Sequence, residues 1–253
     1  MSKDPVVKVI VDVIIRYDIC AVQEVCDKDG VAVYDLLKEL NDKTNGKYSL
    51  QLGPRVGNTY RDTEQYAFYY RHDVVTVLGN YTYSDPNNVF ARDPYMVYFS
   101  TTESVLKRFV FGAIHTRPKH AVSEIDHLTK VNADAKEQFQ DENVLIGGDY
   151  NADCAYVKEH DWKEISYRTM PIFTWLIDDD AKTNLARTSS CAYDRLVTHG
   201  QGFRDAYLPG SAKVFYYDQD LYDTPMNRTL ALAVSDHYPV EMSIKDPNRI
   251  QPL

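Results

Sequence analysis

The amino-acid sequence predicts one domain of mixed α and β structure, with two mainly antiparallel sheets packed face to face and helices on the outside. Two kinds of apolar pattern indicate mixed α and β structure, and runs of strands with helices clustered between them suggest the packing of two sheets. Apolar residues recur at helical spacing in three segments, and short alternating runs separated by turn residues fill much of the first half. No linker, repeat or low-complexity segment divides the 253 residues, so we expect a single domain over 1–253.

The expected elements follow from these periods in chain order. A helical pattern opens the chain, a strand follows it, and a second helical pattern ends near Gly46. Alternation between turn clusters such as Asp85-Pro86-Asn87-Asn88 then predicts antiparallel strands. The expected helices are 5–17, 31–41 and 120–139, and the expected strands are 18–25, several within 48–114, 143–148, 193–198 and 238–245.

Composition excludes several classes of protein. The formal net charge is −9 and the isoelectric point is near 5.2, which disfavours a protein that coats nucleic acid through bulk positive charge. A metal-dependent nuclease remains compatible with this negative charge, because its carboxylates hold a divalent cation that makes the site positive. No run of apolar residues is long enough to span a membrane. Residues 6–15 contain Lys8 and Asp12 and lack a cleavage site, so we expect a helix there and no secretion signal.

Three apolar runs end in polar side chains that suit phosphodiester hydrolysis, and a fourth group of such side chains stands just before an alternating strand. These side chains are Glu24, His115, Asp149 with Asn151, and Asp236 with His237. Strands that open into one cleft would bring them together. Each signal alone is weak, because strand ends often carry a turn-forming Asp or Asn. Together, carboxylates for a cation and imidazoles for proton transfer predict metal-assisted hydrolysis.

Motifs along the chain resemble the deoxyribonuclease I family, within the larger endonuclease/exonuclease/phosphatase superfamily. The matching segments include Val22-Gln23-Glu24-Val25, Glu64-Gln65-Tyr66, Arg92-Asp93-Pro94, Ile114-His115-Thr116, Gly148-Asp149-Tyr150-Asn151, Cys191-Ala192-Tyr193-Asp194-Arg195 and Ser235-Asp236-His237. They occur in the family's order over nearly the whole chain. The resemblance implies a four-layered α/β sandwich, whereas periodicity alone supports only mixed α and β structure.

The resemblance also implies the roles of the reactive residues. Glu24 is expected to be the main metal ligand with Asp236 assisting, and Mg²⁺ or Mn²⁺ is the expected cation, with Ca²⁺ as a further candidate. Two imidazoles are expected to act as general acid and base, each oriented by a carboxylate. These pairs are His115 with Glu64 and His237 with Asp194.

The expected substrate is duplex DNA, cut with little sequence preference. By resemblance, Asp149 and Asn151 lie at the scissile phosphate. Arg and Tyr side chains that donate to phosphates fix the position of DNA without reading its sequence. The residues expected to contact the DNA backbone or line the site are Arg92, Asn58, Tyr60, Tyr156, Tyr193 and Arg195.

Four cysteines allow three pairings in principle. The resemblance implies a disulfide between Cys154 and Cys191, and such a bond forms in an oxidising compartment, so we expect secretion. Cys20 and Cys26 would share a face with Glu24 if their strand is regular. We expect both to be buried free thiols, with a second bridge as the alternative.

The chain departs from the family pattern at its start. Family members open with a strand followed by a helix, whereas Met1-Ser2-Lys3 already falls at the beginning of that helix. Loss of an interior strand leaves its neighbours with unpaired main-chain groups, so we expect weakened folding or activity. Cys26 replaces a DNA-binding Arg of the family. The segment Ser49–Leu52 lacks the family's apolar pair for actin, so we expect no actin binding, and we expect a monomer.

Two alternatives to a deoxyribonuclease remain at this point. The first keeps the superfamily chemistry and acts on a phosphoinositide, sphingomyelin or an abasic site, although the Cys154 and Cys191 motifs favour the deoxyribonuclease branch. The second is a truncated product that binds DNA or a protein partner without turnover. Metal-dependent nicking that is abolished by His115→Ala or His237→Ala would exclude it.

Overall fold

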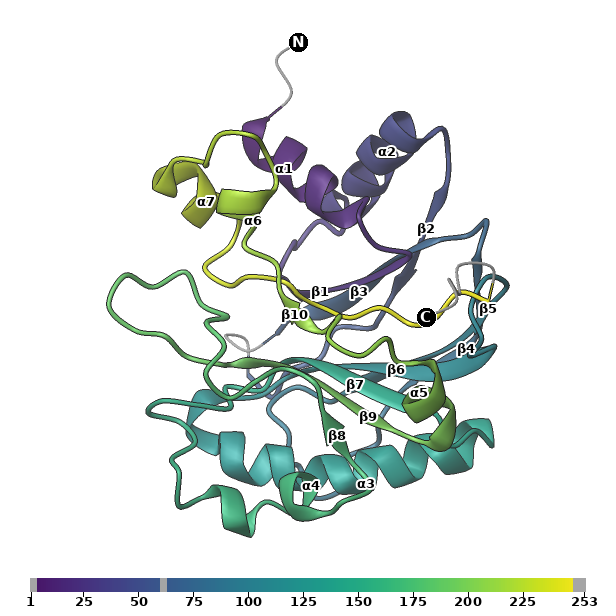
Figure 1. The fold of residues 1–253 in the computed structure, drawn as a ribbon, viewed down its shortest axis with the longest axis vertical. Helices are drawn as coiled ribbons and strands as arrows, with labels where there is room; N and C mark the ends of the chain where they lie inside the picture. The colour runs from purple at the N-terminus through teal and green to yellow at the C-terminus, as the bar shows by residue number, and fades with distance from the viewer. Residues whose placement is uncertain (1–3, 60–62, 248–253) are drawn as a thin grey trace.

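Two stacked sheets with helices on their outer faces form the protein in the computed structural model, which describes residues 4–59 and 63–247 (Figure 1). The larger sheet has the strand order β4-β5-β6-β7-β9-β8. Adjacent strands of this sheet are antiparallel, except that β6 and β7 are parallel. The strands are β4 (Val75–Thr82), β5 (Tyr95–Thr101), β6 (Arg108–His115), β7 (Val144–Asp149), β8 (Thr174–Trp175) and β9 (Asp194–His199).

The outer face of the larger sheet is covered by the longest helix. Helix α3 (Ala121–Phe139) places Ile125 and Leu128 in one fully buried cluster with Val110 and Ile146 of the sheet. Burial of such side chains stabilises by about 1.5–3 kcal/mol each, which fixes the helix on the sheet. Shorter elements in this layer are η1 (Pro118–His120), η2 (Trp162–Glu164) and α4 (Ser166–Thr169).

The smaller sheet has three antiparallel strands in the order β1-β3-β2. Its outer face packs on two helices, where Val11 and Leu40 are buried with Ala67 and Tyr69 of β3. The Asp4 side chain caps the first helix by accepting a hydrogen bond from Val6 N. The elements are α1 (Pro5–Ile14), β1 (Ile19–Val25), α2 (Ala32–Thr44), β2 (Tyr48–Leu52) and β3 (Gln65–Arg71).

An apolar cluster between the sheets completes the layers. Phe68 of the smaller sheet meets Phe99 and Phe111 of the larger one, with ring centroids 5.9 and 5.2 Å away. The order of helices, sheet, sheet and helix confirms the predicted four-layered sandwich (Figure 1).

The last third of the chain differs most from the prediction. The strand expected at 238–245 is regular only at β11, which pairs with β10. The sequence periodicity did not indicate β8, β10 or the short helices, because elements of two to seven residues are too short to show a period. The additional elements are α5 (Gln201–Ala206), β10 (Lys213–Val214), α6 (Tyr217–Asp220), α7 (Arg228–Val234) and β11 (Val240–Glu241).

Strand β1 is an edge strand of the smaller sheet. It is paired with β3 along one side, and β11 belongs to a separate two-stranded sheet. A cavity lies between β1 and the chain around β11. In the described ranges, no helix is both long and apolar enough to cross a bilayer.

Candidate active site

Three predicted site residues stand side by side across adjacent strands. His115 ends β6 and pairs in register with Asp149 at the end of β7, and Asp149 pairs with Asp194 at the start of β9. Parallel pairing of β6 and β7 brings their carboxyl ends to the same edge, as the sequence analysis expects of a cleft. Sheet register therefore brings together groups that are up to 79 positions apart in sequence.

His115 is held by a buried carboxylate. Its Nδ1 lies 3.1 Å from both oxygens of Glu64, which is 2% exposed. Its main-chain N–H donates to the hydroxyl of Tyr66 at 3.0 Å. Burial lowers the pKa of His115, but the hydrogen bonds and the charge of Glu64 more than offset this, so the pKa is raised. With Nδ1 bound to Glu64, Nε2 is the ring nitrogen that faces the carboxylates of Glu24 and Asp149, at 3.8 and 3.7 Å.

His237 repeats this arrangement from a different part of the chain. Its Nδ1 lies 2.8 Å from Asp194 Oδ2, and the Thr183 hydroxyl fixes Asp194 by accepting its main-chain N–H at 3.1 Å. Burial lowers the pKa of His237, yet the hydrogen bond and charge of Asp194 raise it to about 10. The imidazole therefore carries a proton at neutral pH in the metal-free protein.

Asp149 lies between the two imidazoles. Its Oδ2 is 3.7 Å from His115 Nε2 and 3.9 Å from His237 Nε2. Burial and the neighbouring charge of Asp194 raise the pKa of Asp149 to about 6, although both imidazoles lower it. The two rings thus face one carboxylate, and a phosphate group at this point would be within reach of both.

Asn151 is fixed at the same edge by two hydrogen bonds. Its main-chain N–H donates to Asp149 Oδ1 at 2.7 Å, and its side-chain amide donates to the carbonyl of Thr116 at 3.0 Å. Its φ is +48°, a left-handed conformation that Asn adopts more readily than most residues. The second amide hydrogen is not used by these contacts.

Glu24 enters the site through an irregularity in β1. The pairing register of β1 with β3 shifts between Val22 and Val25, and Glu24 has a φ of +57°. The carboxylate is 63% exposed, with Oε1 3.8 Å from His115 Nε2. The regular strand expected for Cys20, Glu24 and Cys26 is therefore wrong, because a bulge redirects the side chains that follow it.

Gln23 and Gly148 are site residues that the sequence analysis did not single out. The Gln23 amide donates to the carbonyl of Ile114 at 2.5 Å and accepts the main-chain N–H of Asp149 at 2.9 Å, so it joins the smaller sheet to the end of β7 in the larger one. A Cβ at Gly148 would lie 2.1 Å from the Ile114 carbonyl oxygen, so only glycine fits this close approach. Their signal in the sequence was their position beside Glu24 and Asp149.

Acidic and imidazole groups suited to a divalent cation gather at this edge. Ligand atoms of Asp149, Asp194 and His237 all lie within 4.8 Å of one another. Carboxylate oxygens are the donors that Mg²⁺ and Mn²⁺ accept, so the donor set fits such an ion. Glu24 lies beside His115, whereas Asp236 is exposed and its carbonyl accepts a hydrogen bond from Leu185 N at 2.6 Å.

The residues predicted to contact DNA divide into two groups. Tyr193 stacks on His237 with ring centroids 6.0 Å apart, and Tyr156 lies 5.5 Å from Tyr193 and is 38% exposed. Asn58 is exposed, although its amide donates to the carbonyl of Phe90 at 2.8 Å. Tyr60 lies outside the described residues. These rings therefore flank the candidate proton-transfer group.

The two predicted arginines are more buried than expected. Arg195 is 1% exposed, donates to the carbonyls of Ile177 and Ala152, and pairs with Asp179 at 2.9 Å. A DNA contact by Arg195 is therefore a wrong prediction. The buried side chain instead joins the segment 177–179 to the main chain at Ala152. Arg92 is 12% exposed at its side chain, with Nε 2.7 Å from Glu64 Oε2.

The predicted disulfide between Cys154 and Cys191 is confirmed, with the two Cα atoms 5.9 Å apart. It joins the loop after β7 to the loop before β9, next to Asp149 and Asp194. Cys20 and Cys26 are both free, as expected, but only Cys20 is partly buried, and Cys26 is exposed. Burial raises the pKa of the Cys20 thiol to about 12.

Comparison with known sequences gives close relatives over most of the chain. A sequence model of the Endonuclease/Exonuclease/phosphatase family matches residues 2–237. Mouse deoxyribonuclease-1-like 2 is 40% identical over 94% of this chain and 84% of its own length. Chicken deoxyribonuclease-1 is 39% identical over 97% of this chain and 87% of its own length. Human deoxyribonuclease gamma is 39% identical, with 94% and 78% covered.

Solved structures show the same fold at low identity. An endonuclease/exonuclease/phosphatase family protein from Leptotrichia buccalis has a TM-score of 0.66 at 15% identity, covering 95% of this chain and 92% of its own. Zebrafish TDP2, solved with a single-strand DNA product, has a TM-score of 0.62 at 13% identity over 95% and 92% of the two chains. This chain therefore belongs to the endonuclease/exonuclease/phosphatase family and, within it, to the deoxyribonuclease I family.

Proposed function

We propose that this protein is a metal-dependent endonuclease that hydrolyses phosphodiester bonds of duplex DNA with little sequence preference. One observation carries the proposal: the Asp149 carboxylate stands between His115 Nε2 and His237 Nε2, at 3.7 and 3.9 Å. Each imidazole is held from behind by its own carboxylate. Two oriented imidazoles that face the same carboxylate could serve the two proton transfers of phosphodiester hydrolysis. One assists the attack of water on the phosphate, and the other assists the departure of the leaving oxygen.

In this proposal the imidazoles divide the proton transfers. One ring accepts the proton of the attacking water, and the other donates a proton to the leaving oxygen. Glu64 and Asp194 fix the Nδ1 side of each ring, so that Nε2 carries the exchange. Asn151 donates its remaining amide hydrogen to a phosphate oxygen, and Asp149 orients the attacking water or contributes to the cation site.

A divalent cation completes the proposed site, with Mg²⁺ or Mn²⁺ expected and Ca²⁺ as a further candidate. Glu24 is the proposed main ligand, and the Asp149, Asp194 and His237 group supplies further donors. Asp236, whose side chain is exposed, is the proposed assisting ligand. When bound, such a cation neutralises charge on the phosphate and lowers the pKa of water.

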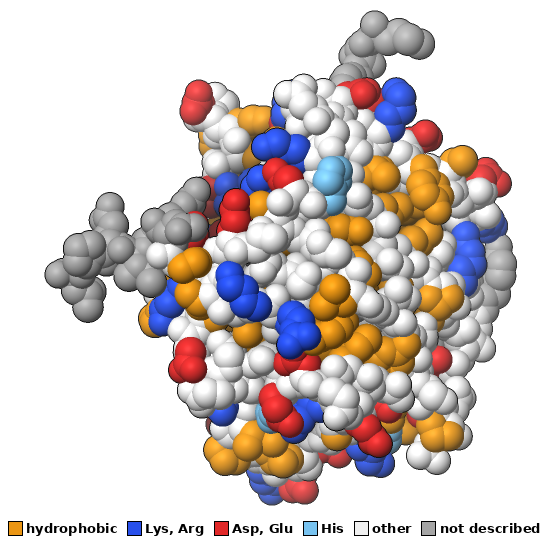
Figure 2. Space-filling view, turned by 90° about the vertical axis from the view of Figure 1, so that its right-hand side faces the viewer, with side chains coloured by type: hydrophobic (Ala, Val, Ile, Leu, Met, Phe, Trp, Pro, Cys, Tyr) orange, Lys and Arg blue, Asp and Glu red, His pale blue; other side chains and the backbone are white. Residues whose placement is uncertain are grey.

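DNA binding is proposed to rest on local groups at the cleft. Tyr156, Tyr193 and Asn58 would contact the backbone, and the part of Arg92 that remains exposed would do so beside His115. Figure 2 shows the side of the molecule on which Figure 1 labels β4 and β5; basic side chains there are interspersed with acidic and apolar ones, so this side offers no basic stripe for DNA. A net charge of −9 fits this local mode of binding.

We propose that the protein acts outside the cytosol, as a monomer. The disulfide between Cys154 and Cys191 supports an oxidising compartment. Because the bond joins the loop that follows β7 to the loop that precedes β9, its reduction would loosen both loops next to Asp149 and Asp194. We propose no role in actin binding.

A substrate comparison tests the proposed function. Purified protein is incubated with supercoiled plasmid, with a duplex carrying one abasic site, and with phosphoinositide or sphingomyelin vesicles, each with Mg²⁺ and with EDTA. The proposal predicts nicking of undamaged plasmid that EDTA abolishes, with no release of phosphate or headgroup from lipid. Cleavage confined to the abasic duplex or to lipid would replace the proposed substrate while keeping the chemistry. DNA binding without any turnover would show that the proposed enzymatic function is wrong.

A further inference from the structure

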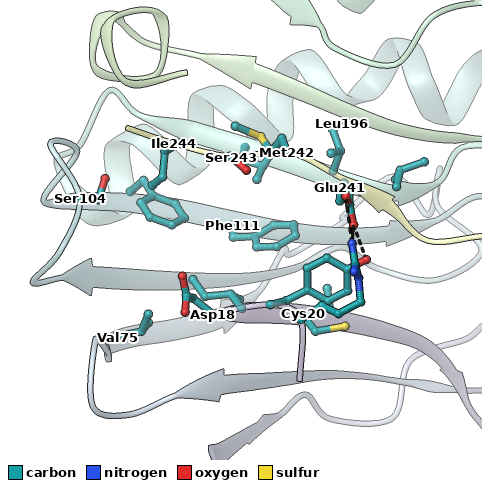
Figure 3. Close-up of a pocket in the computed structure, with 18 of the residues that line it drawn as sticks. Asp18, Cys20, Val75, Ser104, Phe111, Leu196, Glu241, Met242, Ser243 and Ile244 are labelled. Carbon is teal, nitrogen blue, oxygen red and sulfur yellow. Dashed lines mark hydrogen bonds and ion pairs between the residues drawn. The ribbon is translucent and has the colours of Figure 1, made fainter. Parts of the chain in front are cut away.

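Glu124 is a fully buried acidic residue that the proposed hydrolysis does not use. It lies in the first turn of α3, on the outer face of the larger sheet. The large cavity of the molecule lies on the inner face of this sheet, where Figure 3 shows Phe111 and Leu196 in its wall. Among the described residues, none from α3 lines that cavity. Glu124 therefore belongs to a separate set of contacts.

The Glu124 carboxylate accepts main-chain hydrogen bonds from two loops. Its Oε1 accepts the N–H of Ala91, in the loop before β5, at 3.3 Å. Both of its oxygens lie 3.3 Å from the N–H of Arg117, in the loop after β6. Helix α3 is packed on the sheet by its buried apolar face, so the carboxylate has a rigid base. One side chain thus ties both loops to this helix.

The first loop carries Arg92, which directly follows Ala91 in the chain. The Nε of Arg92 lies 2.7 Å from Glu64, the carboxylate that orients His115. The Arg92 guanidinium also donates to the carbonyl of His115 at 3.4 Å. A shift of the Ala91 main chain would move the base of the Arg92 side chain and weaken its hold on Glu64.

The second loop carries a hydrogen-bond partner of Asn151. Thr116 directly precedes Arg117, and its carbonyl accepts the side-chain amide of Asn151 at 3.0 Å. The N–H of Thr116 donates to the carbonyl of Asp149 at 3.0 Å. Glu124 therefore stands behind this contact as well, one residue away along the chain.

The surroundings of Glu124 consist of donors and positive charges. Burial raises the pKa of Glu124 to about 7, although the main-chain N–H groups and the charges of Arg92 and Arg117 lower it. Tyr66 of β3 also faces it: burial raises the pKa of the Tyr66 hydroxyl, and the charge of Glu124 adds to this. Because burying a charge costs stability, a neutral side chain would serve a purely structural link better.

We propose that Glu124 is a positioning residue for the hydrolysis. Through the first loop it holds Arg92 against Glu64. Through the second loop it holds the carbonyl that fixes Asn151. The expected effect on rate rests on the proposed function, whereas the expected effect on geometry rests on the contacts alone.

The test replaces Glu124 by Gln, which keeps the size of the side chain and removes its charge. Asp126→Asn is the matched control, because Asp126 lies on the same helix and its Oδ1 accepts the main-chain N–H of Ser166, in α4, at 2.6 Å. Both variants of the full chain are assayed for nicking in Mg²⁺ at pH 8, above the pKa of Glu124 of about 7. Their thermal midpoints should stay within about 4 °C of wild type.

Glu124→Gln should lower kcat at least about 10-fold, because small misplacements caused by changes away from the reacting atoms can cost up to about 10²-fold. Asp126→Asn should keep the wild-type kcat. The losses from Glu124→Gln and Arg92→Met should be clearly less than multiplicative when the two changes are combined, because both weaken the same hold on Glu64. A merely structural role for Glu124 predicts independent losses.

Nuclear magnetic resonance measures the geometry without any activity. In the metal-free protein, Glu124→Gln should move or broaden the signals of the Arg92 Nε–H and the Asn151 side-chain amide, whereas Asp126→Asn should leave both unchanged. If Glu124→Gln does not fold, the wild type still decides. Its main-chain amide signals at Ala91 and Arg117 should shift together with a midpoint near pH 7.

Several results would overturn the proposal. They are a wild-type kcat in Glu124→Gln, fully multiplicative losses in the double variant, unmoved signals of Arg92 and Asn151, or main-chain amides that do not titrate together. A loss of rate that only follows a large drop in thermal midpoint would show a merely structural role. If the wild type does not nick DNA, the proposed function fails, and the resonance signals still decide whether Glu124 positions the two loops.

Discussion

Arg92 Nε lies 2.7 Å from Glu64 Oε2, and the same carboxylate lies 3.1 Å from Nδ1 of His115. The arginine that the family resemblance suggests for DNA therefore also holds the carboxylate that orients His115, one of the two proposed proton-transfer groups. Because Glu64 is almost fully buried, its two charged partners determine how firmly it holds the imidazole. This chain of contacts distinguishes a positioning role for Arg92 from a simple phosphate contact.

Replacement of Arg92 by Met should slow plasmid nicking by about 10-fold or more, within the range that general acid–base catalysis contributes. The charge of Arg92 lowers the pKa of His115, so its removal should move the acid limb of the pH–rate profile to higher pH. The measurement is nicking rate against pH, together with DNA affinity by fluorescence anisotropy. An unchanged profile with a loss of affinity that equals the loss of rate would show that Arg92 acts only on DNA.

Stability of the metal-free protein should depend on pH through His237. Asp194 raises the pKa of His237 to about 10 from 6.5, so the bond contributes fully below pH 6.5 and is lost as pH rises through about 10. The stability difference between wild type and Asp194→Asn should therefore shrink between these values, by at most about 1.4 kcal/mol per pH unit. Urea unfolding in EDTA at pH 6, 8 and 10 measures it. A constant difference across this range would contradict the assignment.

Loss of the disulfide should destabilise the protein without removing its site residues. The bond closes a loop with a sequence separation of 37, which corresponds to about 3–4 kcal/mol on the loop-entropy account. Cys154→Ser combined with Cys191→Ser should lower the free energy of unfolding by that order, whereas Cys26→Ser at an exposed free thiol should change it by less than about 0.5 kcal/mol. Equal effects of the two changes in chemical denaturation would refute this.

Glu24 should govern the dependence of the rate on the cation. Changes beside metal ligands typically cost about 10–100-fold in affinity, so Glu24→Gln should raise the Mg²⁺ concentration for half-maximal nicking by at least about 10-fold. Glu159→Gln, at an exposed glutamate, is the matched control. A Mg²⁺ titration of nicking by wild type and both variants gives the comparison. An unchanged half-maximal concentration in Glu24→Gln would assign the ion to other residues.

The sequence predicted most of the long elements because their apolar periods are sustained. Helix α3 begins and ends within one residue of the expected segment, and β7 and β9 differ from expectation by about as little. Of the strand expected at 238–245, only β11 is regular. An alternating apolar pattern shows which side chains are buried, but it does not show whether the main chain is paired with another strand. Short helices such as α6 carry too few residues for any period.

Motif order identified the residues that meet at the cleft, but it could not show which of them reach solvent. His115, Asp149, Asp194 and His237 converge because of strand register and loop closure. Arg195 stands one position after Asp194 and points to the opposite face of β9, where it is buried next to the rings of Trp162 and Trp175. The bulge at Glu24 also left no mark in the sequence, because glutamate has no preference for a left-handed conformation.

The proposed mechanism requires both imidazoles to act on DNA at one point. The most direct measurement is the rate of plasmid nicking in Mg²⁺ by His115→Ala, His237→Ala and His120→Ala, where His120 is an exposed histidine outside the cleft. The first two variants should lose about 10²–10⁴-fold in rate while keeping wild-type folding by circular dichroism, and the third should keep its full rate. Nicking that persists in both cleft variants at the wild-type rate would contradict the proposed mechanism.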